Sequence, residues 1–202
     1  ASNNKYGSSN KNKSFNIEFV SANPTGPMHV GHSRGAIFGD VLANLLMFNG
    51  NKVVKEYYIN DYGNQIKNFT ESVFFRLREI KFNENFPNKE NLYPGDYVID
   101  IAKNILMEFP KINLNDFQNI FNKLSKESLK HSMNLIKTDL KSLGILHDNF
   151  VSESTLVQKN LVDKSIQYLR DKKFVEEGYL NPPKGEENKS WIKTKRLIFK
   201  ST

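Results

Sequence analysis

Two histidines three residues apart, His29 and His32, are the side chains of this sequence best suited to phosphate chemistry. They lie in the segment NPTGPMHVGH (residues 23–32), where the following residues predict the start of a helix. Unpaired backbone amides and the helix dipole favour an anion at such a point. Imidazole groups there can donate hydrogen bonds to phosphate oxygens. The segment is therefore a candidate binding site for a nucleotide polyphosphate.

Glycines and prolines in the same segment support this hypothesis. Gly31 leaves room for a base or a phosphate to approach the backbone. Gly26, Pro24 and Pro27 restrict the shape of the loop before a ligand arrives. The histidine pair also has ordinary explanations, because a histidine near a helix start is often a cap or a packed side chain, and this spacing alone is a weak metal signature. We expect no metal ligands among these residues.

A strand, a helix and a second strand are predicted to position this segment. Residues 15–20 (FNIEFV) alternate apolar and polar side chains, which is typical of a strand with one covered face. From Gly31 the period becomes helical, and residues 52–59 (KVVKEYYI) read as the second strand, so we expect a right-handed parallel crossover. The apolar stripe of the predicted helix consists of Ile37, Phe38, Val41, Leu42, Leu45, Leu46 and Phe48, and we expect it to face the core.

Polar residues next to the two predicted strands are candidates for binding a second ligand. Glu18, in the first strand, is the one carboxylate near the loop, and it could bind a cation or face solvent. NDYGNQ (residues 60–65) follows the second strand, at the edge where open parallel sheets bind their ligands. Asn60, Asp61 and Gly63 are also ordinary turn residues. The residue pattern by itself leaves both explanations open.

Longer stretches around the histidines carry a resemblance to a known family. Residues 17–22 (IEFVSA), 23–35 (NPTGPMHVGHSRG) and 56–65 (EYYINDYGNQ) together resemble the catalytic domain of bacterial-type arginyl-tRNA synthetases. Residues 29–32 (HVGH) correspond to the HIGH signature of class I aminoacyl-tRNA synthetases, and the longer blocks are specific to the arginine enzymes. Weaker similarity, which extends the resemblance over nearly the whole chain, lies in residues 93–98, 143–154 and 177–187.

The resemblance implies an α/β fold, namely a Rossmann-like parallel-sheet nucleotide-binding fold that is interrupted by a helical insertion and by a mixed α+β insertion. The expected parts are a flexible lead-in at 1–14, the first part of the core at 15–65, the helical insertion at 66–137, a return to the core sheet at 138–154 and the second insertion, with a helix and short antiparallel strands, at 155–202. Trp191 is expected to anchor a core in the last part. Relatives carry several more polar residues between the positions matching Thr194 and Arg196.

The resemblance also implies a function, which is the ATP-dependent ligation of L-arginine to tRNA(Arg) through an arginyl-adenylate, with Mg²⁺ on the ATP phosphates. His29 and His32 are the implied catalytic residues. The residues implied for ATP are Pro24, Thr25, Gly26, Pro27, His29, Gly31 and His32, and those implied for arginine are Glu18, Ser21, Asn23, Asn60, Asp61 and Gln65. Glu18 would contact the guanidinium, while Ser21 and Asn23 would lie near the other end of the amino acid.

Composition sets the cellular context that we expect. The chain has 202 residues, no cysteine and a formal net charge of +7. Without cysteine there are no disulfides, and no stretch of about 18 apolar residues is present to span a membrane, so we expect a cytoplasmic protein without membrane contact. The charge fits tRNA as a partner but also fits a solvated lysine-rich surface. We favour a monomer.

Relatives have parts that this sequence lacks. They include an N-terminal tRNA-contacting domain, the remaining guanidinium ligands and a lysine loop of the KMSK type, so we expect this chain to be a catalytic fragment that is inactive alone. Gly26 suggests that the full-length enzyme keeps the KMSK lysine, because relatives without it tend to carry a lysine at this position.

Two other functions compete with this one. The chain could be a class I enzyme for another substrate, or a tRNA-binding module without chemistry, although such a module has no need of the intact loop residues.

His147 and Asp148 are adjacent in a predicted extended segment, which points their side chains to opposite faces, so we expect no catalysis from them.

Overall fold

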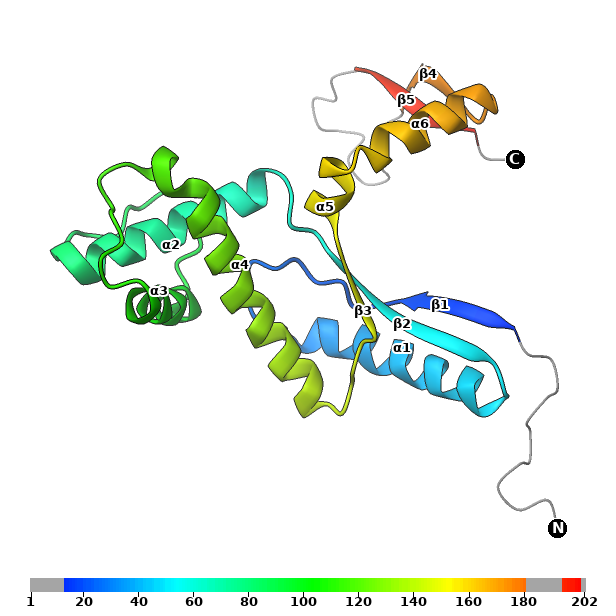
Figure 1. Ribbon diagram of the computed structural model, residues 1–202, viewed down its shortest axis with the longest axis horizontal. Helices are drawn as coiled ribbons and strands as arrows, with labels where there is room; N and C mark the ends of the chain where they lie inside the picture. Colours follow the sequence, from blue (N-terminus) through cyan, green and yellow to red (C-terminus); the bar gives the residue numbers. More distant parts are fainter. Residues whose placement is uncertain (1–12, 181–193, 201–202) are drawn as a thin grey trace, which may run out of the picture. The chain divides into compact units, whose positions relative to one another are not determined.

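The computed structural model describes residues 13–180 and 194–200, which form two compact units divided after Ser154 (Figure 1). Most of the expected lead-in, and Trp191, lie outside the described residues. No helix within the described ranges is long and apolar enough to cross a membrane.

A three-stranded parallel sheet forms the centre of the first unit. The strands β1 (Ser14–Glu18), β2 (Lys52–Ile59) and β3 (Asn149–Ser152) lie in the order β1-β2-β3. The helix α1 (Val30–Phe48) connects β1 to β2, as Figure 1 shows. In the register of the sheet, the last residue of β1, Glu18, lies opposite Glu56 of β2. The strand-helix-strand order and the parallel pairing confirm the predicted α/β, Rossmann-like fold.

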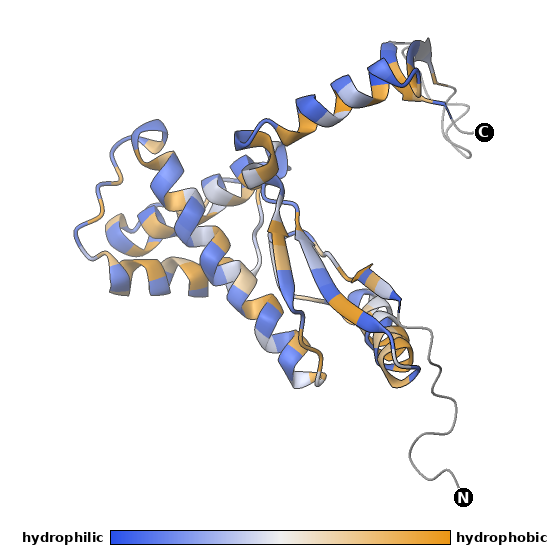
Figure 2. Ribbon diagram, turned by 45° about the vertical axis from the view of Figure 1, so that its right-hand side comes forward, coloured by the Kyte–Doolittle hydropathy of each residue, from blue (hydrophilic) through white to orange (hydrophobic). Residues whose placement is uncertain are grey.

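We predicted that the large apolar stripe of α1 would face the core, and this prediction was wrong. The helix buries its small residues Ala36, Gly39 and Ala43 instead. A Cβ atom on Gly39 would lie 2.3 Å from the ring of Phe19, so the helix backbone approaches the end of β1 too closely for a larger residue. The exposed large apolar side chains of the helix include Ile37, Phe38, Val41, Leu42, Leu45 and Phe48. Figure 2 shows α1 largely in the orange of hydrophobic residues.

This packing predicts opposite effects for two neighbouring residues of α1. Gly39→Ala is expected to lower the free energy of unfolding by about 2 kcal/mol, because the cost of overpacking exceeds the gain in helix propensity of about 1 kcal/mol. Phe38 is 71% exposed, so Phe38→Gln serves as the matched control and should change stability by less than about 0.5 kcal/mol. Chemical denaturation of the chain measures both values. A more stable Gly39→Ala variant would contradict the close contact with Phe19.

Three helices between β2 and β3 form a separate hydrophobic core. They are α2 (Asn64–Phe82), α3 (Asp96–Glu108) and α4 (Phe117–Ser142). The buried side chains of this core are Phe69, Val73, Phe74, Leu77, Val98, Ile101, Ala102, Ile105, Ile112, Leu114 and Leu124. We call these three helices with their connections the helical insertion.

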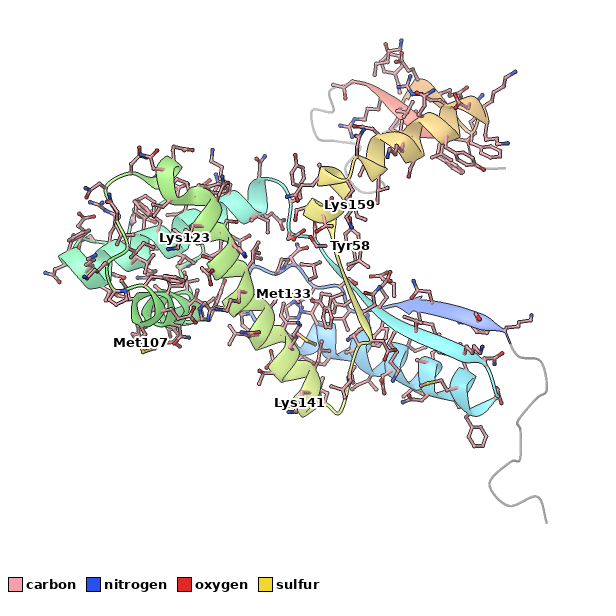
Figure 3. All side chains as sticks on the ribbon, in the orientation of Figure 1. Tyr58, Met107, Lys123, Met133, Lys141 and Lys159 are labelled. Atoms are coloured by element: carbon pink, nitrogen blue, oxygen red, sulfur yellow. The ribbon has the colours of Figure 1, made fainter. Side chains whose placement is uncertain are left out.

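The helix α4 connects the helical insertion to the sheet. Its first half contributes Leu124 to the core of the insertion. Its second half contributes Met133, Ile136 and Leu140 to a second core with Phe19 and other residues of the sheet, and Figure 3 labels Met133 between the two. The helix crosses residue 138, where we expected the insertion to end, without a break.

The second unit contains a helix and an antiparallel strand pair. The helix α5 (Glu153–Gln158) crosses the boundary between the units and is followed by α6 (Leu161–Asp171). The strands β4 (Val175–Tyr179) and β5 (Lys195–Phe199) pair antiparallel. The ion pairs Lys195–Glu177 at 2.5 Å and Lys200–Glu176 at 2.6 Å accompany this pairing.

Candidate nucleotide and amino-acid site

His29 and His32 stack on each other at the start of α1. Their ring centroids are 3.7 Å apart and the rings are inclined by 21°. His29 is the N-cap residue, and its side chain accepts a hydrogen bond from the backbone N–H of Gly31 at 3.1 Å. His32 accepts one from the backbone N–H of His29 at 3.3 Å. The two imidazoles therefore lie together, as the hypothesis of a shared phosphate site requires.

These hydrogen bonds determine which nitrogens can act on a ligand. The acceptor is Nδ1 in both rings, so a neutral ring carries its proton on Nε2. Burial, and then the nearby His29, lower the pKa of His32, which favours its neutral form at neutral pH. The pair thus offers two Nε2–H donors at the positive end of the α1 dipole.

The structure gives Gly31 a second role besides the one predicted. A Cβ atom at this position would lie 2.9 Å from Cε1 of His29, so a side chain there would displace the imidazole. Of the other residues predicted to bind ATP, Pro24 and Thr25 are buried, Gly26 is half-buried and Pro27 is exposed. Pro24 and Thr25 therefore shape the loop from inside the protein.

A tight bend connects β1 to the loop. Val20 and Ser21 both have left-handed backbone conformations, with φ values of 66° and 43°. This conformation is uncommon for a residue other than glycine, and such positions concentrate at functional sites. The Ser21 hydroxyl donates to Glu18 and accepts from the backbone N–H of Tyr58, labelled in Figure 3, at 3.0 Å. The bend thereby holds the Glu18 carboxylate beside the carboxyl end of β2.

Asn23, Asn60 and Gln65 meet beyond the ends of the strands. The Asn23 amide donates to the Gln65 side-chain oxygen at 2.8 Å, and the Asn60 amide donates to the Asn23 side-chain oxygen at 3.1 Å. The three residues come from the loop, from the end of β2 and from the first turn of α2. The structure thus brings together polar groups that the sequence placed in separate blocks.

Asp61 is engaged differently from its neighbours. Its carboxylate accepts hydrogen bonds from the Ser154 backbone N–H at 2.8 Å and from the hydroxyls of Ser152 and Ser154 at 2.7 and 2.9 Å. These bonds tie the end of β2 to the residues at the end of β3. These hydrogen bonds do not test whether Asp61 also lines an amino-acid pocket, which stays a prediction.

His147 packs among aromatic rings, away from the two stacked histidines. Its ring centroid lies 4.3 Å from that of Phe19, 5.4 Å from that of Tyr57 and 5.8 Å from that of Phe150. Both ring nitrogens are buried, and neither makes a well-formed hydrogen bond to a described residue. The Asp148 carboxylate accepts the backbone N–H of Lys55 at 2.8 Å. Neither residue is placed for acid-base chemistry.

This burial predicts a pH-dependent stability. Burial lowers the pKa of His147 below its ordinary value of 6.5. A weak hydrogen bond with the Phe19 backbone opposes this change, Lys55 adds to it, and Asp40 and Asp148 oppose it slightly. The unfolded chain therefore binds this proton more readily, so the stabilising contribution is complete above about pH 6.5 and decreases as the pH falls below that value. His147→Phe should lose less unfolding free energy than the wild type between about pH 7.5 and pH 5.5, as measured by denaturation at both values. An equal loss in the two proteins would contradict the prediction.

Comparisons with known proteins show the family of this chain. A family model described as tRNA synthetases class I (R), catalytic domain, matches residues 1–178. The arginine–tRNA ligase of Pelagibacter ubique (strain HTCC1062) is 54% identical over 200 residues, covering 98% of this chain and 35% of that protein. The arginine–tRNA ligase of Anaplasma phagocytophilum (strain HZ) is 45% identical over 194 residues, covering 95% and 33%. The chain thus spans about a third of the length of these curated relatives.

Solved structures give the same result for the fold. A Campylobacter jejuni protein provisionally named as an arginyl-tRNA synthetase has a TM-score of 0.77 and 32% identity, covering 96% of this chain and 42% of that one. Thermus thermophilus arginyl-tRNA synthetase has a TM-score of 0.54 and 22% identity, covering 82% and 28%, which supports the fold alone.

Proposed function

Because the chain belongs to the family of class I (R) tRNA synthetase catalytic domains, we propose that it binds ATP and L-arginine and forms arginyl-adenylate within an arginine–tRNA ligase. The observation that carries the proposal is the stacked pair His29 and His32 at the start of α1, with two Nε2–H donors available. Donors at a helix N-terminus suit a polyphosphate better than any uncharged ligand.

The histidine pair would act on ATP by stabilising developing charge. In the proposed step, a carboxylate oxygen of arginine attacks the α-phosphorus, and the bond from that phosphorus to the bridging oxygen of pyrophosphate breaks. Negative charge accumulates on the phosphate oxygens during this step. Fixed N–H donors in a preorganised loop stabilise that charge without further rearrangement.

Mg²⁺ is expected as a partner of the nucleotide. No group of three or more histidine, aspartate or glutamate side chains that could hold a metal occurs in the described part of the chain. Mg²⁺ is commonly bound by one or two carboxylates together with substrate phosphates, so the nucleotide would supply most of its ligands besides water. The ion would supply charge neutralisation, while His29 and His32 orient the phosphates.

Arginine would be bound by the polar groups at the ends of β1 and β2. We assign Glu18 to the guanidinium, since a carboxylate can accept two parallel N–H bonds from that planar group. Ser21 positions Glu18 through the hydrogen bond already described. The network of Asn23, Asn60 and Gln65 would bind the other end of the amino acid. We assign Asp61 to holding β2 and β3 together.

We propose that the full-length gene product transfers arginine to tRNA(Arg). We further propose that this protein is a monomer and acts in the cytoplasm. The net charge of +7 is compatible with a tRNA partner.

Calorimetric titration tests the proposed ligands directly. The chain should bind a non-hydrolysable ATP analogue and L-arginine, whereas L-lysine, the matched control cation, should bind at least about tenfold more weakly because it lacks the planar fork. Arginine-dependent pyrophosphate exchange on the full-length gene product, with and without tRNA, tests the reaction. Equal binding of lysine and arginine would favour an enzyme for another substrate. A folded chain that does not bind the ATP analogue would favour a tRNA-binding module without chemistry.

A further inference from the structure

We propose that Tyr97 and Asp139, two residues of the helical insertion, are positioning residues for the ATP site. Residues 24–28 directly precede His29, and we call them the histidine loop. Tyr97 and Asp139 hold this loop in the conformation that orients His29 and His32 toward the ATP phosphates. The inference rests on the proposed role of this loop in ATP binding. It extends that role to a part of the chain that contains neither histidine.

Tyr97 contacts the histidine loop with both its hydroxyl and its ring. The hydroxyl donates to the backbone carbonyl oxygen of Thr25 at 2.9 Å. A Cβ atom on Gly26 would lie 3.1 Å from the ring, so glycine permits the loop to lie directly on the tyrosine. On the insertion side, a Cβ atom on Gly95 would lie 2.6 Å from the same ring. The ring is therefore enclosed by a glycine on each side.

The tyrosine is held by the insertion and remains a donor. The next residue, Val98, is fully buried in the core of the helical insertion, and Tyr97 itself packs against that core. Burial raises the pKa of Tyr97 to about 12, so its hydroxyl keeps its proton at neutral pH. The hydrogen bond to the loop is thus available throughout the physiological range.

Asp139 makes the second contact, at the other end of the histidine loop. Its carboxylate accepts the backbone N–H of Met28, the residue before His29, at 3.2 Å. Ile136 and Leu140, on the same helix, are buried against residues of the sheet, which fixes the position of the carboxylate. Because the loop is not part of a sheet at this point, a side chain takes the place of a strand partner for the Met28 N–H.

The two contacts bracket the middle of the loop. Between the Thr25 carbonyl and the Met28 amide lie Gly26 and Pro27, and the chain then enters the N-cap of α1. Without these contacts the loop would have to be ordered in the transition state, and that entropy cost would appear as a lower rate of adenylate formation. The insertion thereby preorganises the loop for catalysis.

Variants that remove the polar group of each side chain test the proposal in the full-length gene product. Tyr97→Phe removes only the hydroxyl, and Asp139→Ala removes the acceptor. Each should lower kcat for arginine-dependent pyrophosphate exchange about tenfold, which is the typical effect of one lost hydrogen bond, while the KM for arginine changes less than about twofold. Asp139→Asn retains an amide oxygen as acceptor and should recover most of the activity.

A control variant and a second measurement separate positioning from general stability. Lys130→Gln breaks ion pairs with Glu108 and Glu127 on the same helical insertion but does not touch the loop, so it should keep full activity. Hydrogen exchange of the backbone amides of Thr25, Gly26, Met28 and His29 in the 202-residue chain should accelerate in Tyr97→Phe and in Asp139→Ala, and not in Lys130→Gln.

The outcomes separate this inference from the proposed function. A wild-type protein without any arginine-dependent exchange would refute the proposed function, while hydrogen exchange would still report on the loop contacts. Active variants with unchanged hydrogen exchange would overturn the inference. A fall in activity that follows the unfolding temperature in all variants, the Lys130→Gln control included, would assign the two residues a structural role only and would also overturn it.

Discussion

His29→Asn and His32→Gln should each lower the rate of arginyl-adenylate formation by about 10²–10³-fold, the usual effect of removing one preorganised donor from a charged transition state. The replacements are chosen to keep the start of α1 intact. Asparagine is a good N-cap residue, and glutamine at the third helical position can still bind the N-cap amide as His32 does. Single-turnover adenylate formation in the full-length gene product measures the effect.

Helix stability and phosphate binding can be separated by a further substitution. His29→Ala should lose a similar factor in rate and, in addition, about 1 kcal/mol of unfolding free energy, because the cap is also lost. Val30 is 87% exposed in the same turn, so Val30→Ala is the matched control and should leave the rate unchanged. If His29→Asn retained the wild-type rate, the histidine would be a helix cap and no more.

Glu18→Gln should reduce kcat/KM for arginine by about 10²–10³-fold and leave the KM for ATP nearly unchanged. The loss corresponds to roughly 3–4 kcal/mol, within the range found when one member of a hydrogen-bonded charge pair is removed. Glutamine has the same length and keeps an oxygen that can accept from Ser21, so the bend after β1 should be preserved. Pyrophosphate exchange at varied arginine and varied ATP measures both parameters.

Glu56 provides the control for this experiment. It lies directly opposite Glu18 in the register of β1 and β2, but its carboxylate accepts the Asn149 side-chain amide at 2.8 Å. Glu56→Gln should therefore change kcat/KM for arginine less than about threefold if Glu18 alone contacts the guanidinium. Losses of similar size in the two variants would show that both carboxylates take part.

Local features of the site could be predicted from the sequence for a physical reason. A strand, a loop and a helix that follow one another leave few arrangements, so the parallel crossover and the anion-favouring helix start were predictable. His29 and His32 are three residues apart at a helix start, a spacing that brings side chains together in every helix. The stacked pair required no information from distant parts of the chain.

The buried face of α1 shows where the sequence pattern failed. The periodicity rule weighs hydrophobicity, and it favoured the stripe that contains Ile37 and Phe38 over the one that contains Ala36 and Gly39. The contact with the Phe19 ring depends on size instead, and only a small residue permits it. Gly31 is a similar case, because its neighbour is the imidazole of His29.

The sequence by itself determined the family, the order of the first strand, helix and strand, and the paired histidines, because these depend on residues close together in the chain. The tertiary structure decided which partners Asp61 binds, which face of α1 is buried, and that Tyr97 and Asp139 reach the loop. The bonds of Tyr97 to Thr25 and of Asp139 to Met28 span 72 and 111 residues. Contacts over such separations depend on how the helical insertion packs against the sheet, and no local pattern encodes that packing.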